Sequence, residues 1–463
     1  MSISQVKEKA KKAMSTALLL GSLALVGKAG LAQPPNYQNP KPKAETTQMQ
    51  KLPQRELILS LKNPLTDLEA NSNLWYSANQ LLGRANDYLG IRAGLDKNIF
   101  ARLGLSFLAF WNGDIIRHYS HEIAHDQLLE KKGVNKGIHL DFTRWRDGFP
   151  WCPTYVQKVS MEDFLDFSNI EYFRHVANGF NQNELNTRTA WENNTLEGKL
   201  DMYKSAAYLM AKLDDLDYIL GVGFKEERLY RRELNVVSFI LNYHNTPLWN
   251  DVDQYIGLLY NNCVDLTKEE FFGQALATDI LSWHTWESMI SVGKYILKGE
   301  RTSKPFTFKI NKHIEITPPF INLYLTPDGS YFDMNLFVNP SKKHPIKFSF
   351  GMDSDFIRPN EKFIDYGKTE YPAGKVNHLR FGGQMYNITV PLTNLKLSPY
   401  GYLNTNRGFE YKGFSIGTEL KVPVKDTFKI WGRAEYNKDD LIENLIKGEK
   451  NGFNLHIGLE IKI

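Results

Sequence analysis

Two histidines four positions apart, His121 and His125, flank Glu122 in this sequence of 463 residues. On an α-helix, side chains four residues apart lie on the same face, so both imidazoles can bind one metal ion. Histidine is a usual ligand of Zn²⁺, and a carboxylate beside such an ion can take a proton from water. The spacing predicts a zinc site with Glu122 as general base. The alternative is a chance match of five residues on a solvated helix face.

The segment from His121 to His125 resembles the His-Glu-x-x-His helix of the zincin metallopeptidases. This resemblance covers one helix, and it implies a Zn²⁺ cofactor, a hydrolase and a peptide or protein substrate. Asp126 and Gln127 depart from the family, in which uncharged and then apolar residues usually follow the second histidine.

A catalytic zinc site needs a third protein ligand and one open position. In the gluzincin branch of the zincins a Glu on a downstream helix, often preceded by Asn, completes the site, and Asn183-Glu184 is similar. The resemblance therefore implies Glu184 as the third metal ligand. His175 is the competing ligand, and the structural alternative for Glu184 is an ion pair with Arg188 four residues later.

Helices are expected to carry all of these residues, because apolar residues between about Glu56 and Glu300 recur with a period near 3.6. The predicted helices span residues 66–90, 98–131, 161–192, 200–220, 227–245, 251–262 and 268–298. On the second of them, His118 extends the polar stripe of the two histidines. It is interpreted as a partner of the ligands, a third ligand or a surface histidine. A long loop is expected over 133–160.

After Lys304 the apolar period changes to two, which is typical of strands with one apolar and one polar face. The last segment is the clearest example, with Phe453, Leu455 and Ile457 alternating with polar residues. Eight strands are predicted, at about 313–325, 330–338, 345–353, 378–391, 395–404, 409–423, 426–436 and 452–463. The fold class that follows is α + β, with a helical N-terminal domain at 54–300 and an antiparallel β-barrel at 305–463.

An even number of strands of about ten residues, each with an apolar face, resembles the eight-stranded β-barrels of bacterial outer membranes. The two longest connections, 354–377 and 437–451, fall on the same side of such a barrel. With these loops outside the cell, the resemblance implies contact with outer-membrane lipid and a helical domain in the periplasm. The alternative is a soluble barrel or sandwich whose apolar face is an ordinary core.

The first 32 residues have the features of a secretory signal peptide: a lysine-rich start, an apolar run from Ala13 to Gly27 and a small-residue exit at Gly30-Leu31-Ala32. The run is shorter than the roughly 20 residues that cross a bilayer, which favours cleavage over a membrane anchor. Residues 33–53, rich in Pro, Gln and Asn, are predicted to be a flexible linker.

Charge and cysteine content exclude two classes of function. Residues 1–32 hold five of the 56 basic and one of the 52 acidic residues, so the rest of the chain is neutral and lacks the basic surplus of nucleic-acid-binding proteins. Cys152 and Cys263 are too few for a cysteine metal cluster. Whether these two cysteines pair stays open, as does the oligomeric state.

Together these features predict a zinc-dependent hydrolase, specifically a peptidase, of the bacterial cell envelope, anchored by an outer-membrane barrel. The competing prediction is a non-catalytic, barrel-anchored envelope protein that binds a partner or lipid and whose histidines are incidental.

Overall fold

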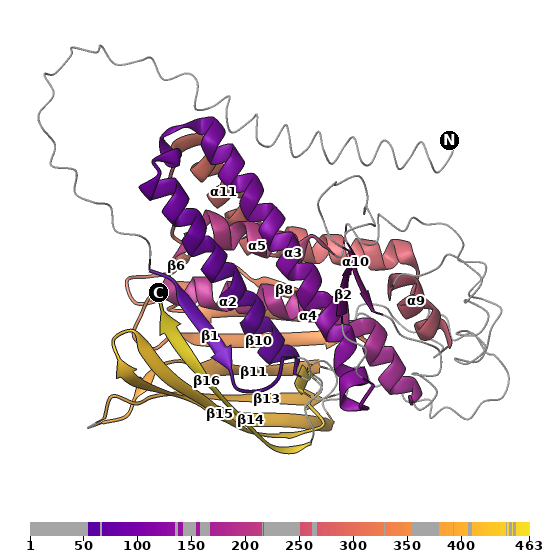
Figure 1. Ribbon diagram of the computed structural model, residues 1–463. Coiled ribbons are helices and arrows are strands. Elements are labelled where there is room, and N and C mark those ends of the chain that lie inside the picture. The colour runs from indigo at the N-terminus through magenta and orange to yellow at the C-terminus, as the bar shows by residue number, and fades with distance from the viewer. Residues whose placement is uncertain are drawn as a thin grey trace, which may run out of the picture. The chain divides into compact units, whose positions relative to one another are not determined.

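The computed structural model describes most of the chain after residue 53 as parts of one compact unit, Leu52–Ile463 (Figure 1). The described residues are 54–64, 67–134, 138–141, 154–157, 167–214, 216, 251–261, 266–327, 329–353, 379–391, 393–405, 410–440, 442–443, 447 and 451–463. Several predictions concern segments outside these residues: the signal peptide, the linker, the helix at 227–245, the loop at 354–377 and the two cysteines.

The helices of the N-terminal half lie where the apolar period predicts them. They are α2 (Leu68–Asp87), α3 (Ile99–Lys131), α4 (Asn169–Glu197), α5 (Met202–Lys212), α9 (Asp251–Asn261), α10 (Lys268–Leu281) and α11 (Trp283–Lys298). Side chains define their beginnings: Asn98 caps α3, and Ser168 forms a capping box with Glu171 that begins α4 later than predicted. The predicted helix at 268–298 is two helices, which meet at Ser282.

The C-terminal half forms the predicted antiparallel sheet. Its main strands are β8 (Phe320–Thr326), β9 (Gly329–Val338), β10 (Ile346–Asp353), β11 (Leu379–Met385), β13 (Lys396–Thr405), β14 (Tyr411–Lys425), β15 (Phe428–Lys438) and β16 (Gly452–Lys462). Short strands at its margins are β6 (Phe308–Lys309), β7 (Glu315–Ile316) and β12 (Ile388–Thr389). Two small two-stranded sheets lie elsewhere: β2 (Ile138–Asp141) pairs with β3 (Thr154–Gln157) inside the predicted long loop, and β4 (Leu200–Asp201) pairs with β5 (Thr302–Ser303).

The first strand of the sheet was not predicted. β1 (Glu56–Ser60) comes before all the described helices and pairs antiparallel with β16, the last strand. The sheet order is therefore β1-β16-β15-β14-β13-β11-β10-β9-β7-β6, with β8 also paired to β9. The prediction of a closed eight-stranded barrel is wrong, because among the described strands no pairing joins β1 to the opposite end of this sheet.

Helix side chains bind the backbone of two outer strands of the sheet, β1 and β8. At β1, the N–H of Ile58 donates to the Ser77 hydroxyl of α2 (2.8 Å), which donates to the Ile58 carbonyl (2.6 Å). At β8, the amide of Asn181 on α4 both donates to and accepts from the backbone of Leu325. Ser282 makes the same reciprocal pair with Ile321. Helix side chains thus take the place of a neighbouring strand at these edges.

The sheet is apolar outside and polar inside. On β16, Phe453 and Ile457 are 70% and 41% exposed, whereas His456 and Glu460 between and beyond them are 1% and 2% exposed. The same alternation occurs on β10, where Phe348 is exposed and its neighbours Lys347 and Ser349 are buried. The apolar face of these strands is therefore not the core, contrary to the interpretation as an ordinary soluble sandwich.

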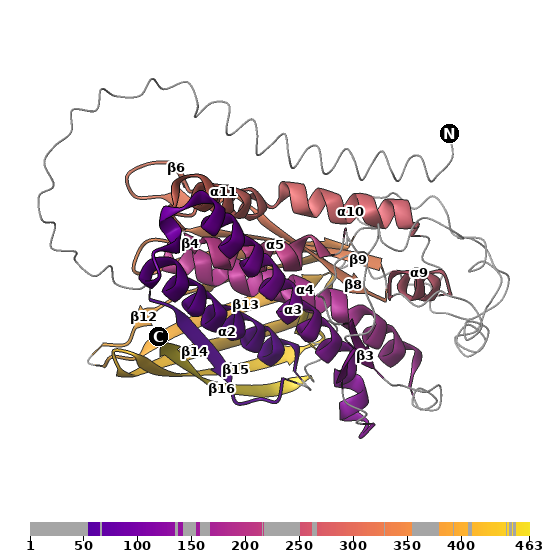
Figure 2. The ribbon, with the colours of Figure 1, turned by 45° about the horizontal axis from the view of Figure 1, so that its top comes forward.

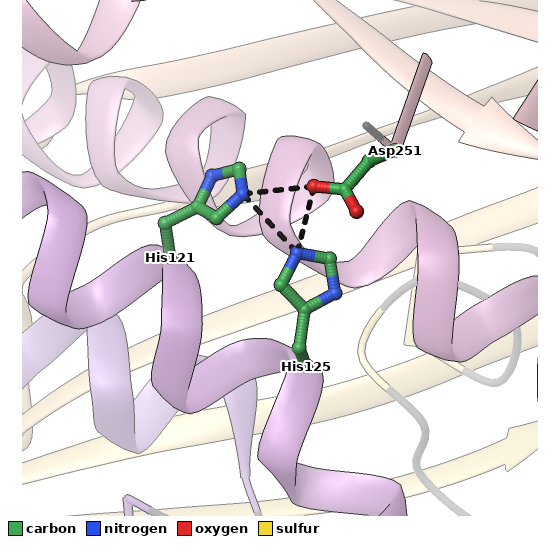
Figure 3. A group of neighbouring side chains, drawn as sticks. All are labelled: His121, His125 and Asp251. Carbon is green, nitrogen blue, oxygen red and sulfur yellow. Dashed lines mark hydrogen bonds and ion pairs between the residues drawn. The ribbon is translucent and has the colours of Figure 1, made fainter. Parts of the chain in front are cut away.

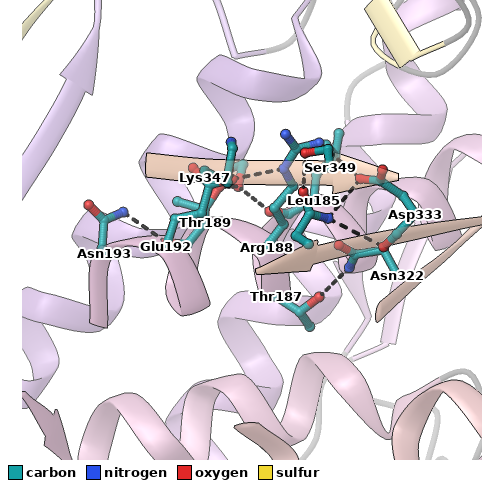
Figure 4. A network of polar contacts seen from close by, with 12 residues as sticks. Leu185, Thr187, Arg188, Thr189, Glu192, Asn193, Asn322, Asp333, Lys347 and Ser349 are labelled. Atoms are coloured by element: carbon teal, nitrogen blue, oxygen red, sulfur yellow. Dashed lines mark hydrogen bonds and ion pairs between the residues drawn. The ribbon is translucent and has the colours of Figure 1, made fainter. Parts of the chain in front are cut away.

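The polar inner face contacts the helices, which lie over it in both views (Figures 1 and 2). Arg433 of β15 binds Glu69 of α2 at 2.6 Å, and Lys347 of β10 binds Glu192 of α4 at 2.8 Å. Arg188 of α4 reaches Asp333 of β9 at 3.4 Å, as Figure 4 shows. The described elements change from helices to strands near residue 300, and these buried charges join the two parts within the compact unit Leu52–Ile463.

Among the described helices, only α3 is long and apolar enough to cross a membrane by length and composition alone. One face of this helix is buried at Leu105 and Ala109, while Leu103 and Phe107 are exposed. The buried face packs on α2, α4 and α5.

The edge contact of β1 predicts that Ser77→Ala destabilises the protein. Alanine is the better helix former, so helix propensity alone would stabilise α2. The substitution also leaves the N–H and C=O of Ile58 without partners, and we expect a net loss of about 1–3 kcal/mol in the free energy of unfolding, measured by denaturant titration. The control is Ser341→Ala, an exposed serine that donates to Glu315 and should change stability by less than about 0.5 kcal/mol. Equal stabilities of the two variants would contradict the assigned role of Ser77.

Candidate metal centre

Three potential ligand atoms converge between α3, α4 and α9 (Figure 3). The Nε2 atoms of His121 and His125 lie 3.1 Å apart, as the helical spacing predicts. Asp251, the first residue of α9, places its Oδ2 atom 3.3 Å from Nε2 of His121 and 3.1 Å from Nε2 of His125. These residues form a group that could hold a metal ion.

The spacing of the three atoms matches a tetrahedral site. Zinc bonds of about 2.0–2.1 Å to nitrogen and oxygen separate neighbouring ligand atoms by roughly 3.3–3.4 Å. The observed separations of 3.1–3.3 Å are close to this value without rearrangement. Two histidines and one carboxylate also form a donor set common to catalytic zinc sites, with one position left for water or substrate.

Gly179 of α4 faces the two imidazoles at close range. A Cβ atom at this position would lie 2.3 Å from Nε2 of His121 and 2.4 Å from Nε2 of His125. Glycine inside a helix costs about 0.5–1 kcal/mol relative to alanine. Gly179, which has no Cβ, therefore occupies the position at which a Cβ would collide with Nε2 of both histidines.

The second ring nitrogens are held by buried groups. Nδ1 of His125 donates to the carbonyl of His175 at 2.5 Å, and Nδ1 of His175 donates in return to the carbonyl of His125 at 2.8 Å. Nδ1 of His121 lies 3.2 Å from the amide of Asn183, which donates to Asp214 at 2.7 Å. A carbonyl such as that of His175 accepts the Nδ1 proton of an imidazole and leaves its Nε2 free to bind an ion. The amide nitrogen of Asn183 is a donor and faces an unprotonated Nδ1 of His121.

The electrostatic interactions within the group favour one protonated histidine next to the negatively charged Asp251. Burial lowers the pKa of His121. Burial alone would also lower the pKa of His125, but the charge and hydrogen bond of Asp251 raise it to about 9. Burial would raise the pKa of Asp251, yet the two histidines hold it well below its usual range. A divalent cation at the same point would replace the proton, since imidazole binds metals in its neutral form.

Glu122, the predicted general base, lies half-buried beside the two histidines on α3. Its negative charge is one of the causes that raise the pKa of His125. The carboxylate and the site therefore interact electrostatically.

Glu184 does not join the histidines. Its carboxylate accepts two hydrogen bonds from Lys212 of α5, at 2.8 and 2.9 Å. Gly179 and Asn183 are four residues apart on the face of α4 that meets α3, and Glu184 is turned about 100° from Asn183 toward α5 and β8. The alternative partner Arg188 binds Glu192 at 3.0 Å. Asp251 therefore takes the place predicted for Glu184.

The two other histidines of the sequence interpretation also have different contacts. His175 supports His125 through the backbone, and burial, followed by the charge of His125, lowers the pKa of His175 to about 3. His118 is buried beside Asp114 and Arg117, and Arg117 pairs with Asp214. His118 is therefore not a surface residue, and it lies next to the groups that hold Asn183.

Sequence patterns missed Asp251. It lies 126 residues after His125, at the start of a correctly predicted helix. Nothing in its local sequence distinguishes it from the other acidic residues at helix beginnings, because the packing of α9 against α4 brings it to the site.

Comparison of the chain with protein-family models, with curated proteins and with solved structures found no match. Its function must be inferred from the chemistry of its own residues.

The metal centre predicts about one zinc ion per chain in the purified protein, and loss of this zinc when His121 and His125 are both replaced by Ala. Asp251→Ala should weaken zinc binding strongly, whereas Glu184→Gln and His175→Gln should leave it measurable, because neither side chain belongs to the ligand group. Zinc is measured by elemental analysis, with circular dichroism as the check that each variant is folded. Equal metal content in the wild type and the double variant would contradict the assignment of His121 and His125 as metal ligands.

A second prediction concerns Gly179. The variant Gly179→Ala places a methyl group against both Nε2 atoms and should lower zinc affinity by at least about ten-fold, measured by competition with a chelator. Gly104→Ala is the matched control: it lies on α3 in open space, so the added methyl meets no atom within 4 Å. Undiminished affinity in Gly179→Ala would show that the close approach of α4 has no bearing on the metal.

Proposed function

We propose that this protein is a zinc-dependent hydrolase, and specifically a peptidase. The observation that carries the proposal is the buried group of His121, His125 and Asp251 at tetrahedral spacing, with Glu122 next to the first histidine. Two imidazoles and one carboxylate fit a catalytic ion better than a structural one, because catalytic sites keep a position open. The side chain of Asp251 is 20% exposed, so solvent reaches the group from this side.

Zinc in such a site polarises a carbonyl group and makes a water molecule acidic enough to react near neutral pH. The residues of the chain supply the remaining parts. Glu122 accepts the proton of the attacking water and returns it to the leaving amine. Asn183, Asp214 and the carbonyl of His175 keep the imidazoles in place.

The role of Glu122 predicts that Glu122→Gln separates binding from catalysis. The variant should retain its zinc and lose about 10²–10⁴-fold in the rate of peptide hydrolysis, measured with a mixture of fluorogenic peptides. Removal of zinc by a chelator should abolish wild-type activity, and added zinc should restore it. Glu300→Gln, which changes an exposed carboxylate, is the control. Full activity in Glu122→Gln would show that this carboxylate is not the base.

We further propose that the outward face of the sheet contacts the lipid of a bacterial outer membrane, with the chain exported by its N-terminal signal. The support is the apolar outer face of β16 and β10 and the polar inner face behind it. Unsatisfied backbone groups are costly in lipid, and the described edge contacts of β1 and β8 satisfy such groups with helix side chains.

Ile457→Arg tests the surroundings of this face. An arginine at the bilayer midplane costs about 2–4 kcal/mol, whereas an exposed surface position in water tolerates it within about 0.5 kcal/mol. Because Ile457 points outward, burial in a protein core cannot mimic the lipid penalty. We expect the larger cost for unfolding measured in lipid vesicles. A neutral effect, or recovery of the wild-type protein in the soluble fraction without detergent, would contradict the membrane placement.

A further inference from the structure

A second site lies inside the sheet, apart from the metal centre. It is a cavity of about 170 Å³ between α2, α4 and the inner faces of the strands from β10 to β16. On α4 it is lined by Arg188 and Glu192, which lie beyond Gly179 and Asn183 along the helix. Glu419 and Lys421 of β14 line one margin, and their side chains are partly exposed, so this margin is open to the surroundings.

Charged side chains line the cavity, but they are paired with one another. Arg433 binds Glu69 at 2.6 Å, and Lys447 binds Glu443 at 3.1 Å. Lys347 binds Glu192 at 2.8 Å (Figure 4). The described lining holds one carboxylate more than it holds cations, and these cations already face carboxylates, so the cavity does not favour an anionic ligand.

Four polar atoms of the lining have no hydrogen-bond partner within the described residues. Two of them belong to ion pairs, Nε of Arg433 with Glu435 and Oε1 of Glu460 with Lys429. The other two are Nε1 of Trp431, a donor, and Oε2 of Glu443, an acceptor, on side chains that are 6% and 4% exposed. Buried polar groups normally have partners, and an unmade hydrogen bond costs about 1–3 kcal/mol. A bound molecule that both accepts and donates hydrogen bonds would satisfy both atoms.

Aromatic side chains and further groups that can hydrogen-bond to a hydroxyl also line the cavity. Tyr386, Tyr400 and Tyr402 line it together with Trp431. The Tyr400 hydroxyl donates to Glu435. Burial, followed by the nearby charge of Glu443, raises the pKa of Glu435 to about 7. This carboxyl group therefore titrates near neutral pH, where it can both donate and accept hydrogen bonds.

Size and chemistry together define the ligand. A protein cavity of about 150 Å³ is known to hold one benzene ring, so a cavity of this size accommodates a single six-membered ring. We propose that the cavity binds one neutral sugar ring, with a hydroxyl donating to Glu443, another accepting from Trp431 and the ring lying against the aromatic side chains. The proposal does not depend on the hydrolase activity.

The test is ligand-detected NMR by saturation transfer on the full-length protein in a detergent without a sugar headgroup. The probes are the methyl glycosides of glucose, galactose, mannose and N-acetylglucosamine at millimolar concentration, with glycine and benzoate as zwitterionic and anionic controls. At least one glycoside should receive saturation, and the controls should receive none. Trp431→Phe, which keeps a ring and removes the donor, and Glu443→Gln should each weaken binding about ten-fold or more.

Two further measurements show that the glycoside binds in this cavity of the folded protein and not at the metal centre. The variant with both His121 and His125 changed to Ala should bind the glycoside as well as the wild type, because the metal centre does not line the cavity. A thermal shift with the best glycoside, absent in Trp431→Phe, would confirm binding to the folded state. The proposal is overturned if no glycoside binds, if glycine or benzoate binds instead, or if Trp431→Phe and Glu443→Gln bind as tightly as the wild type. In the first case the cavity holds only water.

Discussion

The structure depends on the polarity of the inner face of the sheet. A charge removed from water costs several kcal/mol unless another group compensates it. Arg433, Lys347 and Asp333 point inward from three different strands, and each finds its partner on a helix. The helices form the layer that supplies partners to the charged inner face of the sheet, and both belong to the compact unit Leu52–Ile463.

Helix α4 connects the candidate metal centre to this interior. Its Gly179 and Asn183 meet the histidines of α3, while Glu184 pairs with Lys212 and Arg188 reaches Asp333. This arrangement explains how the amide and charged side chains of this helix can be buried: they face other polar groups. It also gives the imidazoles a rigid support, because a shift of α4 would disturb ion pairs on the opposite side of the helix.

The edges of the sheet obey the same requirement for hydrogen-bond partners. Ser77, Asn181 and Ser282 each donate to and accept from one backbone residue of an outer strand. A hydroxyl or amide can do this because it carries both a donor and an acceptor. These contacts give backbone groups of β1 and β8 hydrogen-bond partners, although the outer surface of the sheet is apolar. Closure of the sheet on itself is therefore not needed to protect β1 and β8.

Local periodicity was enough to locate the helices and the strands after residue 300, and the i,i+4 spacing was enough to bring His121 and His125 together. Both follow from backbone geometry over a few neighbouring residues, so the local sequence is enough to predict them. The pairing of β1 with β16, the open sheet and the choice of Asp251 over Glu184 were decided by tertiary structure. Each of these features joins segments that are far apart in the chain, and burial and the need for hydrogen-bond partners bring them together. Glu184 points toward Lys212 because of the packing of α4, which its local sequence does not specify.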